Sequence, residues 1–477
     1  MKLIRFLTIL ASAISTTSAI ALHKKNDGNE PRVIAFDLHR NKIRDPVAHD
    51  RHRRHKRSGS IDVELDNEVT LYYFNASLGT PKQDFRFHLD TGSSDLWVNS
   101  KESTLCSTAS NVCSDSGTYA ANKSSTYEYV GSYFNISYTD GSGAAGDYVT
   151  DNFHVGNTTI KNLQFGIGYE STSSECVLGI GYPANEVQVG RAGKSAYNNL
   201  PAKMAADGLI ASNAYSMWLN DLEAETGTIL FGGVDQAQYE GSLVTLPVQK
   251  SGDDYSAFFI TLDGLGLANE TIGDDMSLAV LLDSGSSLSY LPSKYTDTIY
   301  DQIGAVYDEE QRIAFLPCSA ATDAGNMTFK FSDPAEIVIP VSELIIDFLQ
   351  ITGRQLSFDD GTPACMFGIA PATGTNVLGD SFLRSAYVVF DLDNNEISLA
   401  QSKVNATGTN IVEIGTGENA VPSATAAKNP IAAKSGLPSV STSSNTDDDD
   451  ESGALSVRSS NLSIVVAMVL VFASLLV

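Results

Sequence analysis

Two aspartates stand in matching surroundings at distant positions of this 477-residue chain. Asp90 lies in FHLDTGSSDLWVNS and Asp283 lies in AVLLDSGSSLSYLP, 193 residues further on. Two carboxyl groups placed side by side cannot both ionise easily, so such a pair would hold one proton over a broad acidic range. The ionised member could take a proton from water while its partner donates one to a carbonyl oxygen. That is general acid–base hydrolysis of an amide without a covalent intermediate.

The residues that follow each aspartate suit this chemistry. Glycines permit the tight turns that would bring the acids together, and serine hydroxyls can hold the outer carboxylate oxygens. The residue directly after each aspartate can bind main-chain groups across the two halves. The glycines are Gly92 and Gly285, the serines are Ser93 and Ser286, and the residues directly after the aspartates are Thr91 and Ser284. One Asp-Thr-Gly is a common turn, but two apolar-Asp-[Ser/Thr]-Gly-Ser-Ser copies are a specific signal.

Other chemistries lack their residues. A Ser-His-Asp or Cys-His mechanism needs a well-placed histidine, and only His88 and His154 follow residue 57. His88 would point to the same side of a strand as Asp90, where a packed residue is the simpler interpretation. No spacing of His and Cys suits zinc, so we expect no metal ligands and no cofactor. No glycine-rich phosphate loop with a following lysine is present.

The elements that must position the two aspartates are strands. Residues 61–401 contain apolar or aromatic runs closed by Gly, Asn or Asp turns, which predicts an all-β body. Helical patterns are few and short, and LPAKMAADGLI is the clearest. VLGIG with Gly179 follows Asp90 by 89 residues, and NVLGD with Gly379 follows Asp283 by 96 residues. This weak repeat predicts two lobes of one design, residues 58–245 and 246–403.

The two motifs and their flanks resemble the pepsin-like aspartic proteases over residues 66–401. The resemblance implies two β-barrel-like lobes with an active-site cleft between them. It implies a flap hairpin in ISYTDGSGAAGDYVTD, with Tyr138, Asp140 and Gly141 over the substrate and Trp97 as the hydrogen-bonding partner of Tyr138. The second motif departs from the commoner Asp-Thr-Gly, because Ser284 keeps the hydroxyl but lacks the methyl group.

Five cysteines suit two disulfides and one unpaired thiol. Cys106 and Cys113 can close a small loop, and Cys318–Cys365 is expected as the second pair, which corresponds to a disulfide of the family. Cys176 is interpreted as a buried apolar residue rather than a reactive one.

Both ends of the chain look like processing signals. Residues 1–21 are predicted to be a secretory signal peptide. Residues 22–57 are predicted to be a propeptide that ends at a dibasic site, Lys56-Arg57. The alternative for residues 22–57 is a simple targeting leader. Cleavage at Lys56-Arg57 by a secretory-pathway convertase and self-cleavage at the same site both remain open. Residues 404–452 have the composition of a disordered Ser/Thr-rich stalk. Residues 453–477, with Ser452 or Gly453 at the attachment site, read as a GPI-anchor signal, with a single membrane span as the alternative.

N-glycosylation sequons are expected at the surface of a secreted chain. They lie at Asn75, Asn122, Asn135, Asn157, Asn269, Asn326, Asn405 and Asn461.

Charge separates the leader from the body. Residues 1–57 carry 13 Lys and Arg against 5 Asp and Glu, which leaves 18 against 52 in residues 58–477. An acidic body disfavours nucleic acid and favours basic polypeptides, including the basic leader itself, although acidity can also serve solubility alone.

The whole arrangement resembles the fungal yapsins, which cleave after Lys or Arg at the plasma membrane or cell wall. It implies a GPI-anchored endopeptidase, with cell-wall glucan as a further attachment. Many yapsins carry a long acidic insert in the first lobe that is cleaved to give two chains. The region from Cys106 to Tyr127 is short here, so we expect a single-chain enzyme and a monomer. Asp140 would recognise a basic side chain, or it is a solvated turn residue. A peptide-degrading barrier-type protease and a catalytically inactive, peptide-binding wall glycoprotein are the alternatives.

Overall fold

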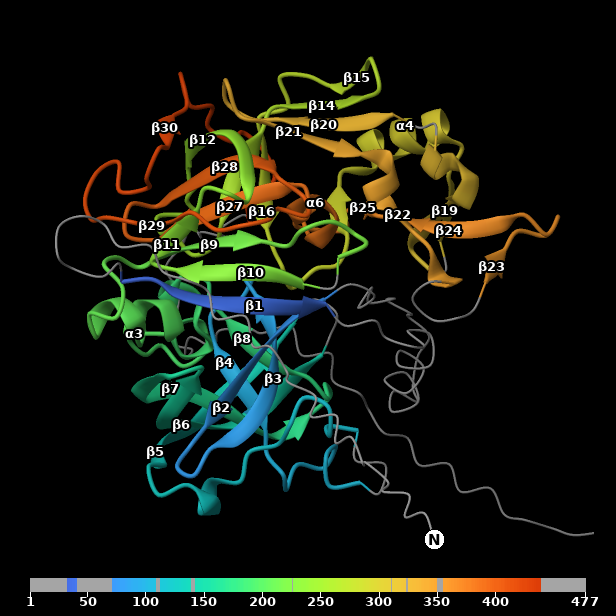
Figure 1. The fold of residues 1–477 in the computed structure, drawn as a ribbon. Helices are drawn as coiled ribbons and strands as arrows, with labels where there is room; N and C mark the ends of the chain where they lie inside the picture. Colours follow the sequence, from blue (N-terminus) through green and yellow to red (C-terminus); the bar gives the residue numbers. More distant parts are fainter. Residues whose placement is uncertain are drawn as a thin grey trace, which may run out of the picture. The chain divides into compact units, whose positions relative to one another are not determined.

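A sheet of 14 strands runs through the described parts of the chain and joins its two halves (Figure 1). The computed structural model describes residues 32–40, 71–108, 112–138, 142–224, 226–309, 311–322, 325–349 and 355–438. All of them belong to one compact unit. The neighbours in the sheet follow the order β30-β12-β28-β27-β9-β10-β1-β2-β3-β8-β4-β7-β6-β5. Strands from the C-terminal half therefore continue directly into those of the N-terminal half.

The strands of this sheet are β1 (Ile34–Arg40), β2 (Tyr72–Leu78), β3 (Gln83–Asp90), β4 (Leu96–Asn99), β5 (Glu128–Ser137), β6 (Gly143–Val155), β7 (Thr158–Ser171), β8 (Cys176–Gly179), β9 (Ala214–Trp218), β10 (Thr226–Phe231), β12 (Tyr239–Pro247), β27 (Ala386–Asp391), β28 (Glu396–Ser402) and β30 (Thr425–Ala426).

Smaller sheets complete the second half. One holds β13 (Phe259–Leu262), β16 (Leu278–Leu282), β26 (Val377–Leu378), β17 (Ser289–Leu291) and β25 (Ile369–Pro371). A second holds β15 (Glu270–Gly273), β14 (Gly264–Leu267), β20 (Asn326–Lys330) and β21 (Glu336–Pro340). A third holds β18 (Val306–Asp308), β19 (Ile313–Pro317), β24 (Pro363–Phe367), β22 (Ile345–Ile346) and β23 (Leu356–Ser357), and β11 (Gly233–Asp235) pairs with β29 (Ile411–Glu413). The prediction of an all-β body is confirmed.

Helices are short in the part of the chain that the structure describes. They are α2 (Val187–Gly190), α3 (Leu200–Ala206), α4 (Ser293–Ile303) and α6 (Asp380–Leu383). The predicted helix in LPAKMAADGLI is α3. The sequence reading missed α4, the longest of them, although its signals are present. Thr296, Ile299 and Tyr300 are buried at helical spacing, and Gly304 ends the helix with a left-handed φ of 69°.

Strand β1 lies inside the segment interpreted as a propeptide. It pairs antiparallel with β10 on one side and with β2 on the other (Figure 1). Its signal is the alternation of Ile34, Phe36 and Leu38, which stands out little within a basic segment. Phe36 packs edge-on against Phe74, with ring centroids 4.9 Å apart. Part of the predicted propeptide is thus a central strand of the main sheet.

Residues 404–438 correct the prediction of a disordered stalk that begins at residue 404. This extension of the chain forms β29 and β30, and Ile411, Ile414 and Val421 are buried. Few apolar side chains are needed here, because the edges of existing strands supply backbone hydrogen bonds. Composition alone does not reveal such pairing. Residues 439–452 lie outside the described part.

The main apolar core draws on both halves, and Phe87 of β3 and Phe390 of β27 belong to the same cluster. Among the described residues, no helix is long and apolar enough to cross a membrane.

Candidate active site

Two strands carry the two aspartates to one place. Asp90 is the last residue of β3, and Asp283 directly follows β16. Gly179 pairs with Asp90 in the adjacent parallel strand β8. A Cβ atom on Gly179 would meet the Ser94 nitrogen at 2.7 Å, and one on Gly379 would meet the Ser286 oxygen at 2.3 Å. The repeated apolar-apolar-Gly element therefore lies against the loop after each aspartate, where a side chain would not fit.

Each carboxylate is held in the same way. The Gly92 nitrogen donates to Asp90 Oδ1 at 2.8 Å, and Ser93 Oγ donates to Asp90 Oδ2 at 2.5 Å. In the second half, the Gly285 nitrogen donates to Asp283 Oδ1 and Ser286 Oγ donates to Asp283 Oδ2, both at 2.8 Å. These are the hydrogen bonds expected for Ser93 and Ser286.

The glycines also set how closely the two halves approach. A Cβ atom on Gly92 would lie 2.5 Å from Asp283 Oδ1, and one on Gly285 would lie 2.6 Å from Asp90 Oδ1. Each Oδ1 atom therefore faces the turn of the opposite half. The sequence analysis assigned these two glycines to tight turns. The structure shows that the close contact between the halves requires them as well.

A reciprocal set of hydrogen bonds beneath the aspartates ties the loops together. The Ser284 nitrogen donates to Thr91 Oγ1 at 2.9 Å, and the Thr91 nitrogen donates to Ser284 Oγ at 3.2 Å. Thr91 Oγ1 donates to the Leu282 oxygen at 3.0 Å, and Ser284 Oγ donates to the Leu89 oxygen at 2.9 Å. Both side chains are buried. The hydroxyl that serine and threonine share is what this contact uses.

Burial favours the protonated form of both acids. It is the largest cause that raises the pKa of Asp90, and the hydrogen bonds from Ser93 and Gly92 oppose it. Burial and then the nearby charge of Asp90 raise the pKa of Asp283 to about 7. The two carboxyls titrate as one unit. Such a pair can hold a single proton at acidic pH, shared between Asp90 and Asp283.

A cleft of about 630 Å³ contains the pair, and both halves line it. Tyr138 lines it directly after β5, and its backbone nitrogen donates to the Ser142 oxygen at 2.9 Å. Trp97 Nε1 donates to the Tyr138 hydroxyl at 2.7 Å, as the resemblance implied. Asp140 and Gly141 lie outside the described residues.

Trp97→Phe is expected to lower kcat/KM about 5-fold, because one hydrogen bond that orients Tyr138 is lost. Trp218→Phe is the matched control, since Trp218 lies in β9 and its buried Nε1 has no hydrogen-bond partner. Steady-state kinetics on one peptide substrate measure both variants. Equal losses in the two variants would contradict a role for the Trp97–Tyr138 hydrogen bond.

The cleft wall contains two further buried acids, Asp95 and Glu186, which the sequence analysis did not predict. Asp95 accepts hydrogen bonds from the hydroxyls of Tyr148 and Tyr197, at 2.5 and 2.9 Å. Glu186 accepts one from the Tyr197 nitrogen at 2.8 Å, and burial raises its pKa to about 9. Protonated Glu186 adds no charge to the cleft in acid. Asp95 follows Asp90 within the same motif, but Glu186 has no pattern that would have revealed it.

His88 is both packed and part of the cleft wall. Its ring lies 5.8 Å from that of Tyr73, and only 8% of the residue is exposed. Burial lowers the pKa of His88, so the neutral imidazole is favoured. The sequence interpretation of a packed strand residue is correct, and the contact with the cleft adds to it.

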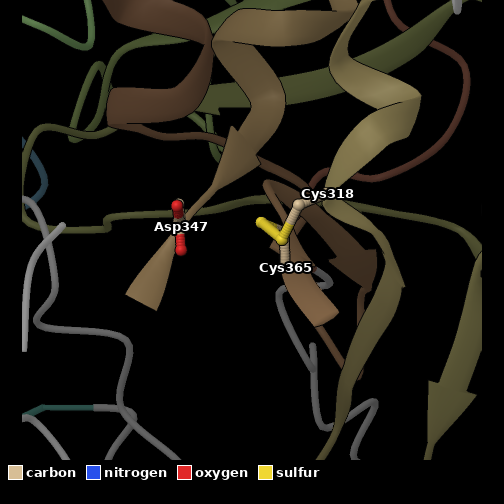
Figure 2. A group of neighbouring side chains, drawn as sticks. All are labelled: Cys318, Asp347 and Cys365. Atoms are coloured by element: carbon tan, nitrogen blue, oxygen red, sulfur yellow. A yellow bond between two sulfur atoms is a disulfide. The ribbon is translucent and has the colours of Figure 1, made fainter. Parts of the chain in front are cut away.

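Both predicted disulfides are present, Cys106–Cys113 and Cys318–Cys365. Figure 2 shows Asp347 beside the second one, a grouping that resembles a metal site. Because the two sulfur atoms are bonded to each other, they are not available as thiolate ligands. Burial raises the pKa of Cys176 to about 12, so this thiol stays protonated and unreactive.

The sequons in the described range all present exposed asparagines: Asn75, Asn122, Asn135, Asn157, Asn269, Asn326 and Asn405. Asn405 Nδ2 donates to Asp221 Oδ2 at 2.6 Å, so that nitrogen is already engaged. Asn461, Lys56, Arg57, Ser452 and Gly453 lie outside the described residues.

Comparison with known proteins places this fold and site in one class. The profile of the eukaryotic aspartyl protease family matches residues 71–402. The aspartic proteinase of Irpex lacteus has the same fold, with a TM-score of 0.58 and 19% identity over 71% of this chain and 96% of that one. The chain therefore belongs to the eukaryotic aspartyl protease family and has the pepsin fold.

Fungal proteins are similar over most of their length. A protein described as probable aspartic-type endopeptidase opsB of Aspergillus oryzae is 52% identical, over 89% of this chain and 87% of its own. Its namesake in Aspergillus fumigatus is 49% identical over 94% of both chains. Secreted aspartic protease 6 of Candida albicans is 34% identical, over 75% of this chain and 82% of its own. This chain is an aspartic-type endopeptidase.

Proposed function

We propose that Asp90 and Asp283 are the catalytic pair of a secreted, surface-anchored endopeptidase that cleaves at Lys or Arg. The observation that carries the catalytic part is the mutual approach of the two loops. Each Gly lies against the opposite carboxylate, and both carboxylates face one cleft. Matched hydrogen bonds from a Gly nitrogen and a Ser hydroxyl then distinguish this pair from the other acids of the cleft.

The reaction uses the shared proton. Ionised Asp90 takes a proton from a water molecule as that water attacks the carbonyl carbon of the peptide bond. Protonated Asp283 donates its proton to the carbonyl oxygen, which gives a tetrahedral gem-diol. This intermediate collapses as Asp90 passes the proton that it took from water to the leaving amine and Asp283 recovers a proton from a gem-diol hydroxyl. Ser93 and Ser286 keep the carboxyls in register, and Tyr138 covers the substrate. No metal or cofactor is required by these steps.

A preference for basic substrates is supported by charge. The whole chain has a formal net charge of −26, and electrostatic complementarity with such a surface favours cationic peptides. Glu175 lines the cleft and accepts a hydrogen bond from Ser116 Oγ at 2.9 Å. Arg191 also lines the cleft, but its guanidinium group donates hydrogen bonds to Asn135 and Ser137. Asp140 and Glu175 are the candidates for binding a Lys or Arg side chain.

Cleavage of matched peptides tests the proposal. The purified chain is assayed between pH 3 and 7 on peptides that differ only in Lys, Arg, Leu or Phe at the scissile position, with and without pepstatin. We expect at least 10-fold higher kcat/KM for Lys and Arg, and a loss of that preference in Asp140→Ser or Glu175→Gln. Cleavage only between apolar residues would overturn the basic preference. No cleavage of any peptide would favour a catalytically inactive, peptide-binding glycoprotein.

The same proposal includes the maturation of the chain. Residues 1–21 would direct secretion, cleavage after Lys56-Arg57 would remove the propeptide, and a GPI anchor near Ser452 or Gly453 would hold a monomer at the plasma membrane or cell wall. Strand β1 supports a tight association of the propeptide with the body, since Arg40 Nη1 also donates to the Leu222 oxygen. Release from membranes by a phosphatidylinositol-specific phospholipase would support the anchor, and a barrier-type protease without an anchor would be found in the medium.

A further inference from the structure

A segment of the C-terminal extension completes the strand that carries Asp283. The amides of Ala279, Leu281 and Asp283 all donate along one edge of β16. Asp283 donates to the Leu378 oxygen at 3.1 Å and Leu281 to the Asn376 oxygen at 2.9 Å. Because β26 has only two residues, it does not reach the first amide of this row. Ala279 instead donates to the Ser435 oxygen at 2.8 Å.

Gly436 fits tightly at the same point. Its φ of 85° is left-handed, and a Cβ atom there would lie 2.6 Å from Asn376 Nδ2 and 2.7 Å from the Ala279 oxygen. These two atoms are hydrogen-bonded to each other at 3.1 Å. The extension therefore contacts both β16 and the residue before β26, at the end of β16 opposite Asp283.

Hydrogen bonds hold this segment to the body of the chain. The Lys434 nitrogen donates to the Ser277 oxygen at 2.8 Å. The Ile431 nitrogen donates to Ser332 Oγ at 2.8 Å, and the Ala433 nitrogen donates to Gln249 Oε1 at 3.1 Å. Residues 431–436 lie beyond the family match, which ends at residue 402. They therefore lie outside the part of the chain that matches the family profile.

We propose that residues 431–436 are positioning residues for Asp283. They supply the first hydrogen bond on this edge of β16 and so restrain the strand. Because Asp283 directly follows β16, this restraint holds its carboxyl group opposite Asp90. Catalysis by the pair depends on placement within fractions of an ångström, so a displaced segment would lower kcat more than it raises KM. This inference rests on the proposed role of Asp283 and adds a requirement for the C-terminal extension.

Glycine variants of the full chain test the inference. Gly436→Ala introduces both a left-handed alanine and the two close contacts. Gly417→Ala is the matched control, because Gly417 lies in the same extension with a φ of 79° and nothing within 4 Å of its added Cβ. We expect Gly436→Ala to lower kcat 5- to 20-fold, leave KM within 2-fold and shift the alkaline limb of the pH–rate profile. Gly417→Ala should stay within 2-fold of the parent in all three.

A second variant releases the segment without a steric clash. Ser332→Ala with Gln249→Ala removes two of its side-chain anchors, and kcat should fall 2- to 5-fold with an unchanged melting temperature. If Gly436→Ala behaves like Gly417→Ala, or if the anchor variant retains full kcat, the inference is overturned. An inactive parent chain would instead refute the proposed function, so the two failures are distinguishable.

Discussion

Replacing Asp283 with asparagine is expected to lower kcat about 10⁴-fold, the upper range for loss of a general acid. Asparagine has nearly the same shape, and its oxygen can still accept the hydrogen bond that the Gly285 nitrogen donates to Asp283 Oδ1 at 2.8 Å. It cannot give up a proton to a carbonyl oxygen. Circular dichroism and the melting temperature should therefore remain close to those of the parent chain, while peptide hydrolysis is lost.

The pH dependence follows from the same residue. Burial and the charge of Asp90 raise the pKa of Asp283 to about 7. Below that pH the pair keeps its single proton, and as the pH rises through it the general acid is lost. We expect kcat of the parent to fall above about pH 7, and residual activity of Asp283→Asn to lack that decline.

Asp95→Asn is the matched control for Asp283→Asn. Asp95 also lines the cleft, and burial raises its pKa as well, but Tyr148, Tyr197 and Val187 satisfy its carboxylate. Its replacement should reduce kcat no more than about 10-fold, the equivalent of one ordinary hydrogen bond. Similar losses for both variants would mean that buried carboxyl groups in general, rather than this pair, support activity.

Gly92→Ala is expected to lower kcat at least 100-fold. The added methyl group would lie 2.5 Å from Asp283 Oδ1, so the two loops must move apart or the carboxylate must rotate. A displacement of about 1 Å at a reacting group is enough for a 100-fold loss. Steady-state kinetics on the preferred peptide, together with the melting temperature, would separate misplacement from unfolding.

Gly374→Ala provides the comparison for this substitution. Gly374 also lines the cleft, but an added Cβ atom there meets nothing within 4 Å. Its replacement should leave kcat within about 2-fold. A Gly92→Ala enzyme that is folded and as active as Gly374→Ala would show that the loops do not need this close approach, and the proposed pairing of the aspartates would fail with it.

Local patterns in the sequence determined the class of the protein. Alternating apolar residues closed by turn residues predicted the strands, and two matching Asp-[Ser/Thr]-Gly-Ser-Ser motifs identified the acids and the serines that hold them. Cysteine spacing predicted Cys106–Cys113. These features depend on residues that are close in the chain, where conformational preference and hydrogen-bonding capacity act directly.

Only the tertiary structure decided which distant groups meet. Nothing local to Glu186 predicts its burial in the cleft wall, and the Ala- and Pro-containing composition around Ser435 does not reveal its hydrogen bond to Ala279 of β16. Strand β1 was likewise hidden in a basic segment, although it forms the centre of the main sheet. The reason is physical: an open strand edge accepts almost any backbone, because its partners are amides and carbonyls that every residue except proline supplies. Which segment takes that place depends on how the whole chain packs.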